Sequence, residues 1–187
     1  MMQRQREETV IVLDFLLNGY ATDRTPMHLK TPIVQAIGTV NFTLLELVPK
    51  KGVFLQPFEK VYIGADKREQ IHHINGKIPF DKLTSTAKSE LEPAIKNIVD
   101  LNEKEFIEFF NKAQPINTRM HTFELLPGIG KKHMNEIVEQ RTEKPFENFN
   151  DLKNRVKLMQ DPEKVIIKRI VQELESDNEK HYLFVNK

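Results

Sequence analysis

The stretch Leu125-Leu126-Pro127-Gly128-Ile129-Gly130-Lys131-Lys132 determines how the C-terminal third of this chain folds. Pro127 and Gly128 end any helix before them, because proline lacks an amide proton and glycine adopts a positive φ at little cost. From Lys131 onward, apolar residues recur at helical spacing. The sequence therefore predicts a short helix from residue 117 or 118 to Leu125, a tight glycine turn, and a second helix.

The start of that second helix has the properties of an anion site. The first turn of a helix has backbone N–H groups without intrahelical partners and a partial positive charge, so it attracts phosphate. Ile129 is expected to point inward and fix the turn, while the lysines add charge. Because backbone N–H groups cannot distinguish bases, we expect contact with a nucleic-acid backbone and little sequence preference. The candidate binding residues are Gly128, Ile129, Gly130, Lys131, Lys132 and His133.

A weaker copy of the pattern follows at Leu158-Met159-Gln160-Asp161-Pro162-Glu163-Lys164. It lacks the glycines, but Asp161 and Pro162 are typical of an N-cap and a first helical residue. The Asp161 carboxylate would repel an anion there, and nearby cations only partly offset it. We interpret this segment as a structural second hairpin. The secondary nucleic-acid contacts that we consider are Lys164, Lys168, Arg169 and, from the N-terminal half, Tyr62.

Residues 1–83 are predicted to be rich in β-strands. Apolar runs of strand length are separated by turn residues, and helical spacing is lacking. The runs are residues 9–17, 33–40, 42–48, 60–64, 71–74 and 77–80, the last two joined as a hairpin at Asn75-Gly76. Such a series predicts a small barrel or sandwich, with an unrelated antiparallel sheet as the alternative.

Residues 84–116 are predicted to form a helical connector. Thr84 or Ser85 is suited to cap a first helix, Pro93 to restart it, and Asn102 to cap the next one. An apolar stripe at Phe106, Phe109 and Phe110 is typical of a core face. The two helices joined by the glycine turn, together with the weaker copy, form a domain over residues 117–176. In the tail, residues 177–187, the strand-like run His181–Val185 is expected to dock on the barrel.

Composition limits the classes of function. The 187 residues carry a formal net charge of +1, so nucleic-acid contact requires a local basic patch or backbone amides. The chain has no cysteine, which excludes disulfides, iron–sulfur clusters and thiolate zinc sites. The six histidines show no metal-binding spacing, and adjacent His72 and His73 should face opposite sides of a strand. We expect no cofactor, no secretory leader, no membrane span and a cytoplasmic location.

The hairpin region resembles the helix-hairpin-helix domain of bacterial DNA-uptake proteins. The matching positions are residues 125–132, Ile137, Arg141, Pro145-Phe146, Asp151-Leu152 and Arg155-Val156. That resemblance implies a paired hairpin that grips nucleic-acid backbone.

Nearly the whole chain is similar to an uncharacterised archaeal family. The similar stretches include Phe42–Glu46, Val61–Gly64 and Tyr182–Val185. The resemblance implies an α+β protein with an N-terminal barrel of oligonucleotide/oligosaccharide-binding (OB) type and a C-terminal helix-hairpin-helix, presumed to bind RNA. The partner would be RNA, ribosomal or otherwise structured, or alternatively DNA. Barrel residues that could then stack on or attract it are Tyr20, Arg24, Lys30, Phe42, Lys60, Tyr62, Lys67 and Arg68.

Two other functions compete with nucleic-acid binding. Helix-hairpin-helix units also serve as assembly modules, so a protein-interaction role is the main alternative. DNA glycosylases are similar in having a lysine after the second hairpin glycine, here Lys132, and an aspartate near position 150, where Asp151 lies one residue beyond. Asp151 is equally suited to the first turn of a helix, and the β-rich upstream half does not supply a glycosylase scaffold. We therefore predict a non-enzymatic protein without catalytic residues.

Overall fold

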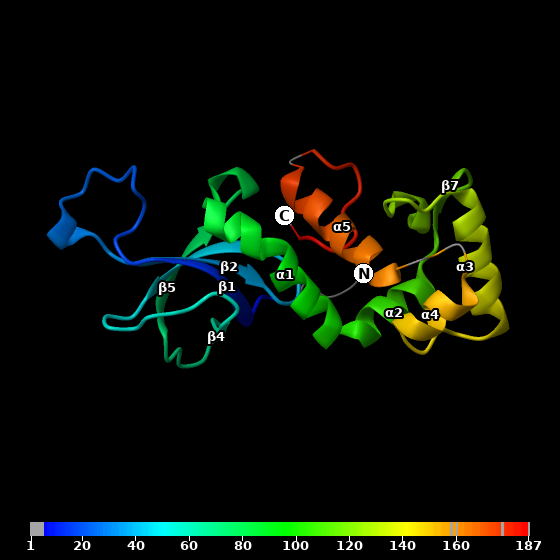
Figure 1. The fold of residues 1–187 in the computed structure, drawn as a ribbon, viewed down its shortest axis with the longest axis horizontal. Coiled ribbons are helices and arrows are strands. Elements are labelled where there is room, and N and C mark those ends of the chain that lie inside the picture. The colour runs from blue at the N-terminus through cyan, green and yellow to red at the C-terminus, as the bar shows by residue number, and fades with distance from the viewer. Residues whose placement is uncertain (1–5, 158, 160, 177, 187) are drawn as a thin grey trace. The chain divides into compact units, whose positions relative to one another are not determined.

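The computed structural model describes residues 6–157, 159, 161–176 and 178–186 (Figure 1). The chain divides into two compact units. Unit 1 contains the chain up to Ile95 together with residues 173–178 and 182 onward, and unit 2 contains residues 96–172 and 179–181. The two helices α1 (Ser85–Leu101) and α5 (Pro162–Glu175) each contribute residues to both units.

Unit 1 is built on a curled, half-barrel sheet of five antiparallel strands in the order β4-β1-β2-β3-β5. The strands are β1 (Thr9–Leu16), β2 (Ile33–Gly38), β3 (Leu44–Pro49), β4 (Lys60–Tyr62) and β5 (Ile71–Lys77). Two short 3-10 helices, η1 (Met27–Leu29) and η2 (Phe80–Lys82), interrupt the loops. The expected α+β class is thus confirmed at the level of a mixed fold with a barrel-like sheet.

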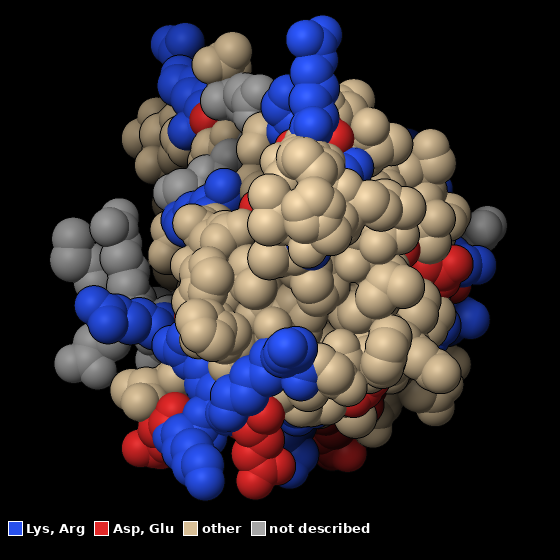
Figure 2. Space-filling view, turned by 90° about the vertical axis from the view of Figure 1, so that its left-hand side faces the viewer, with Lys and Arg blue, Asp and Glu red and all other residues tan. Residues whose placement is uncertain are grey.

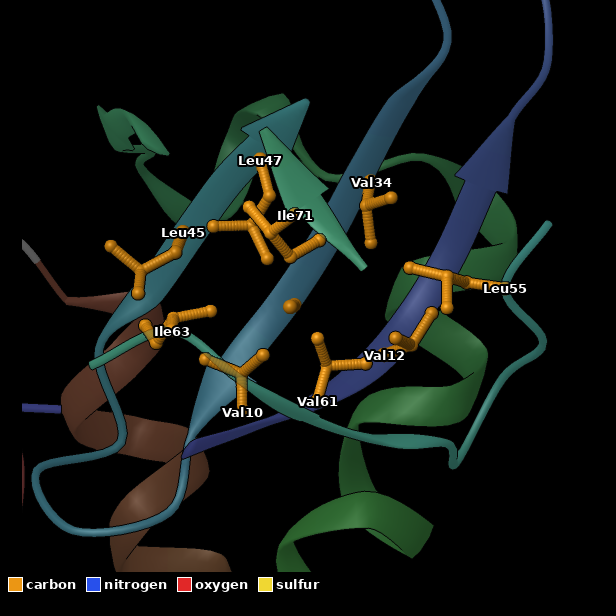
Figure 3. Packing of buried hydrophobic residues seen from close by; sticks show 10 residues of the cluster. Val10, Val12, Val34, Leu45, Leu47, Leu55, Val61, Ile63 and Ile71 are labelled. Carbon is orange, nitrogen blue, oxygen red and sulfur yellow. The ribbon is translucent and has the colours of Figure 1, made fainter. Parts of the chain in front are cut away.

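The concave face of the sheet is closed by aliphatic side chains (Figure 3). Alternate residues of the strands point into this cluster, as a period of two requires. Tyr62 is half-buried between buried Val61 and Ile63, so its side chain points away from this cluster. The buried members are Val10, Val12, Val34, Ala36, Leu45, Leu47, Leu55, Val61, Ile63 and Ile71.

The expected hairpin at Asn75-Gly76 is wrong. β5 continues through both residues and pairs with β3, where Gly76 lies opposite Glu46 and Ile74 opposite Leu47. Asn75 is therefore the extra residue of a β-bulge. Its side-chain amide donates to the Glu46 carboxylate at 2.7 Å, and Gly76 has a φ of 148°. The Asn-Gly pair thus forms a β-bulge, which needs a residue with positive φ just as the predicted hairpin turn does.

A second bulge in β5 overturns the expectation for the adjacent histidines. His73 pairs with Val48 and Ile71 with Pro49, so His72 is the extra residue. A bulge breaks the strict alternation of side chains. The two exposed imidazoles accordingly meet, with their Nδ1 atoms 2.7 Å apart.

The helical connector begins as expected and continues differently. The Thr84 hydroxyl accepts the Ala87 N–H at 3.0 Å and so caps α1. Pro93 does not restart a helix but lies inside α1, on an exposed side where water can satisfy the carbonyl that proline leaves free. Asn102 precedes α2 (Glu103–Lys112), yet its amide donates to the Ile98 carbonyl instead of capping α2. Phe106 and Phe110 are buried, which confirms the core stripe.

Unit 2 continues through a two-stranded hairpin, β6 (Pro115–Asn117) and β7 (Met120–His121), into the 3-10 helix η3 (Thr122–Leu125). The helices α3 (Lys131–Glu143), α4 (Phe149–Arg155) and the first part of α5 follow. Within the described residues, no helix has the length and apolar character needed to cross a membrane.

The tail that was expected to be a strand forms none over its described residues, 178–186. Instead, the buried Glu173 carboxylate accepts three successive backbone N–H groups. Leu183 donates at 2.7 Å, Phe184 at 3.0 Å and Val185 at 2.9 Å. Successive N–H groups that converge on one anion cannot alternate in direction as they do in a strand. The carboxylate therefore determines the tail conformation.

Candidate functional site

The segment before the glycine turn is not the helix that the sequence predicted. Asn117 caps a turn instead of a helix, because its side-chain oxygen accepts the N–H groups of Arg119 at 2.8 Å and Met120 at 3.0 Å. The β6–β7 hairpin results, with Arg119 exposed on its turn. Only the four residues of η3 are helical.

A capping box starts η3. The His121 Nδ1 atom accepts the Phe123 N–H at 3.1 Å, and the Glu124 carboxylate accepts the His121 N–H at 2.8 Å. His121 is therefore neutral, with its proton on Nε2, since Nδ1 acts as an acceptor. Burial, followed by the nearby Arg141 charge, lowers the pKa of His121 from its usual value of 6.5.

The glycine turn has open space in front of it. Gly128 has a φ of 78°, in the region that favours glycine, whereas Gly130 is extended. A Cβ atom at either position would meet no atom within 4 Å. Between them, Ile129 is buried and its N–H donates to the Leu126 carbonyl at 3.1 Å. Ile129 thus points inward, and the outer side of both glycines is free of protein.

The N-terminal turn of α3 begins directly behind that space. Gly130 is its N-cap, no side chain of the described residues caps the helix, and no acidic residue lies in its first turn. Lys131 and Lys132 are exposed, and His133 is half-buried. The helix terminus and the two ammonium groups therefore place positive charge at the same point on the surface.

The turn stands on a rigid aromatic base. Phe123 is fully buried and stacks on Phe110 at 5.7 Å between ring centroids. Arg141 covers the Phe123 ring at 5.4 Å and donates to the Phe110 carbonyl at 3.0 Å. Burial lowers the pKa of Arg141. Arg141, a position of the sequence resemblance, thus packs the base of the site and is not presented to a ligand.

The link from α3 to α4 is held by Arg155. Its guanidinium donates to the carbonyls of Gln140 and, at 2.7 Å, Lys144, and lies 4.7 Å from the Phe146 ring centroid. It also pairs with the Asp151 carboxylate at 3.2 Å. These contacts satisfy the carbonyls at the end of α3.

Asp151 occupies the first turn of α4, as the simpler interpretation of the sequence expected. Its N–H donates to the capping Asn148 side chain at 2.8 Å. Its carboxylate accepts the Glu147 N–H at 3.1 Å besides pairing with Arg155. Asp151 therefore has a structural role, which argues against a glycosylase-like partnership with Lys132.

The predicted second hairpin presents a different surface over its described residues. Asp161 and Pro162 begin α5 as expected, with the Asp161 carboxylate accepting the Lys164 N–H at 3.2 Å. The Lys164 ammonium is paired with the same carboxylate at 3.2 Å, whereas Lys168 is exposed. Leu158 and Gln160, which belong to this predicted hairpin, lie outside the described residues.

Arg169 must be removed from the candidate contacts. Only 5% of it is exposed, and its guanidinium donates to the His181 carbonyl at 2.5 Å. The Glu179 carboxylate lies 3.6 Å away. The apolar periodicity of α5 gave no sign that this cation faces inward.

The aromatic candidates of unit 1 are engaged by the protein itself. Phe42 is buried. The Tyr62 hydroxyl oxygen accepts the Asp66 N–H at 3.3 Å. Tyr20 donates to the Glu46 carboxylate and accepts from Gln35 at 3.0 Å. Burial, followed by the Glu46 contact, raises the pKa of Tyr20 to about 12.

Most of the basic candidates of unit 1 are exposed to solvent. Arg24, Lys60 and Lys67 are exposed, and Lys30 is half-buried. Arg68 is also half-buried, and its Nε atom donates to the Gly64 carbonyl at 2.9 Å. Within the part of the chain that the structure describes, no group of three or more histidine, aspartate or glutamate side chains could hold a metal ion.

Sequence reasoning missed two aromatic residues of unit 1 and the exposed Arg119. Phe54 and Phe58, in the loop between β3 and β4, are 69% and 40% exposed. They belong to no periodic pattern, so the spacing rules that located the strands passed over them.

These observations define the class: a mixed α+β protein with a half-barrel antiparallel sheet and a helical unit that carries a lysine-flanked glycine turn. The chain belongs to the family described as "Protein of unknown function (DUF655)", whose family model matches residues 6–186. Membership confirms the expected uncharacterised archaeal family through its relatives.

One relative is the uncharacterized protein MJ0038 of Methanocaldococcus jannaschii. It is 45% identical over 175 residues, which cover 93% of this chain and 77% of that protein. The crystal structure of Af1531 from Archaeoglobus fulgidus, described with the same family, is 42% identical. It matches with a TM-score of 0.90 over 96% of this chain and 100% of that one. The mixed fold is therefore shared with a solved archaeal structure.

Proposed function

We propose that this protein is a non-enzymatic nucleic-acid-binding protein, with RNA as its main partner, and that a helix-hairpin-helix in unit 2 contacts the phosphate backbone. One observation carries the proposal. The outer side of Gly128 and Gly130 is open, and it faces an uncapped helix terminus flanked by Lys131 and Lys132.

The physical argument rests on how a phosphate would be held. Phosphate oxygens accept hydrogen bonds from the free N–H groups of a first helical turn, and the helix dipole favours their charge. A glycine lets the ligand backbone approach closely because it has no Cβ. Ile129 and the Phe123 base hold the turn in this shape before any ligand arrives, so little ordering is needed on binding.

The sheet of unit 1 supports the assignment of an OB-type barrel. In the order β4-β1-β2-β3-β5, β1 pairs with both β2 and β4, and β3 pairs with both β2 and β5. A partly open five-stranded barrel of this kind is a frequent oligonucleotide-binding fold. The preference for RNA over DNA rests on the resemblance of the whole chain to proteins presumed to bind RNA.

The test is binding of the purified full chain to structured RNA, single-stranded RNA and duplex DNA, by fluorescence anisotropy across a salt series. Affinity should fall as salt rises, because phosphate contacts release counterions. The double variant Lys131→Ala with Lys132→Ala should lower the salt slope by about one for each lost phosphate contact. Lys104→Ala, which removes an exposed lysine on α2, is the matched control and should leave the slope unchanged.

Gly130→Ala tests the geometry without a change of charge. The added methyl group meets nothing in the free protein but occupies the space in which the phosphate is proposed to lie. Binding to duplex should fall at least tenfold while the fold is retained. Equal binding by this variant would overturn the hairpin as the contact. If the protein bound none of the three nucleic acids at low salt, nucleic-acid binding would be refuted, and a protein-interaction role would be the remaining proposal.

A further inference from the structure

The loop between β3 and β4 presents two aromatic rings to solvent. Phe54 and Phe58 are 69% and 40% exposed, whereas Leu55 between them is only 3% exposed. The exposed part of each ring gains nothing from burial in the fold. The alternation of outward and inward side chains shows that the loop has a defined inner and outer side.

This loop is fixed to the sheet. Leu55 belongs to the aliphatic core and lies against β1 near Val12 in Figure 3. The Phe58 N–H donates to the Val12 carbonyl at 2.8 Å, and the Gln56 N–H donates to the Glu59 carboxylate at 3.1 Å. The rings are therefore carried by an ordered backbone and require no rearrangement to receive a flat ligand.

Phe58 also holds an unfavourable backbone conformation. Its φ is 68°, in the left-handed region that non-glycine residues seldom adopt. Glycine or asparagine would relieve that strain. A strained aromatic residue whose side chain points to solvent is typical of a binding surface, because strain of this kind persists at functional positions.

Both residues of the loop lie along β1. The Phe54 ring lies 6.0 Å from the Phe15 ring, and the backbone of Phe58 is hydrogen-bonded to Val12.

The loops that carry and neighbour the rings have a surplus of basic residues. Residues 17–32 and 50–70, which include the short strand β4, contain seven lysines and arginines against four aspartates and glutamates, in a chain whose net charge is only +1. Figure 2 views the molecule from this side and shows an uncharged face with charged side chains of both signs along its edges. Exposed rings beside a surplus of basic residues match a polyanion with planar bases.

We propose that Phe54 and Phe58 form a stacking platform for unpaired bases of a single-stranded nucleic acid. The platform extends the proposed function, because it assumes that the protein binds nucleic acid, but it lies apart from the glycine turn in sequence and chemistry. It adds selectivity for unpaired segments, since stacking needs an exposed base face and tolerates any sequence.

The chain has no tryptophan, which allows a direct optical test. In Phe54→Trp, the single indole should be quenched when a mixed-sequence 12-nucleotide single-stranded RNA is added, and not when the same sequence is added as a duplex. Leu101→Trp is the matched control, because Leu101 is also 69% exposed but lies at the end of α1. Its fluorescence should not respond.

Affinity measurements complete the test. Phe54→Leu and Phe58→Leu keep an apolar side chain but remove the ring, and each should weaken single-strand binding about 5- to 150-fold, the range expected for one base–aromatic stack. Duplex binding should be unchanged in both. Normal single-strand affinity of both variants, or an unquenched indole with RNA bound, would overturn the platform while leaving the hairpin intact. Loss of duplex binding by Gly130→Ala bears on the hairpin alone.

Discussion

Glu173→Ala should release the C-terminal tail, and the cost can be worked from its contacts. Glu173 is fully buried and accepts the N–H groups of Leu183, Phe184 and Val185. If the tail stayed in place, three buried donors would each lose a charged acceptor, at about 1–3 kcal/mol apiece. The alternative is release of the tail into water, which satisfies the donors but exposes Val185, at about 1.5–3 kcal/mol. The cheaper route should prevail.

We therefore expect Glu173→Ala to lower the free energy of unfolding by about 1.5–3 kcal/mol, the cost of the second route, because the first route would cost about 3–9 kcal/mol. Urea denaturation measures this loss. Hydrogen exchange of amides 183–185 distinguishes the routes, because released amides exchange at once. Glu175→Ala, two residues along the same helix at an exposed position, is the control and should change little. Unchanged protection of the three amides in Glu173→Ala would refute the reasoning.

Four further substitutions separate structural from binding roles. Gly128→Ala should lower the free energy of unfolding by about 1–3 kcal/mol, because alanine disfavours a φ of 78°. Gly130→Ala should lower it by under about 1 kcal/mol, and the urea midpoints of the two variants measure the difference. Because the pKa of His121 is lowered in the folded state, stability should be complete above pH 6.5 and fall as pH decreases through that value; His121→Asn, which keeps a capping oxygen, should flatten this profile. Arg155→Lys should lose about 2 kcal/mol in the same assay, since an ammonium cannot bridge two carbonyls and a carboxylate at once.

The strands were predictable because their signal is local. Thr9–Leu16 and Ile33–Gly38 are largely apolar runs of strand length that are buried over consecutive residues, and the sequence alone shows such runs. Bulges were not predictable, because they depend on what the partner strand offers. Asn75-Gly76 carries the same local signal for a hairpin and for a bulge, and only the pairing of β5 with β3 at Glu46 decides between them.

Side-chain roles were predictable where the backbone alone creates them. Gly128 adopts the positive φ that favours glycine, and Ile129 is buried as its apolar side chain favours. Cations were harder, because exposure depends on tertiary contacts: Arg169 turned inward to a carbonyl, and Arg141 packed on Phe123. A lysine or arginine in a sequence thus indicates a charge but not the surface on which the charge lies.

The starts of α3 and α5 differ in a way that supports phosphate binding at the first and not at the second. At α5, the protein itself provides an anion at the helix start. The Asp161 carboxylate accepts the Lys164 N–H and pairs with the Lys164 ammonium. Glu163 adds a second carboxylate in that turn. At α3, the same position is Gly130, which offers no side chain and leaves the two lysines facing solvent. An external anion can complete α3, whereas at α5 it would have to displace a covalently tethered one.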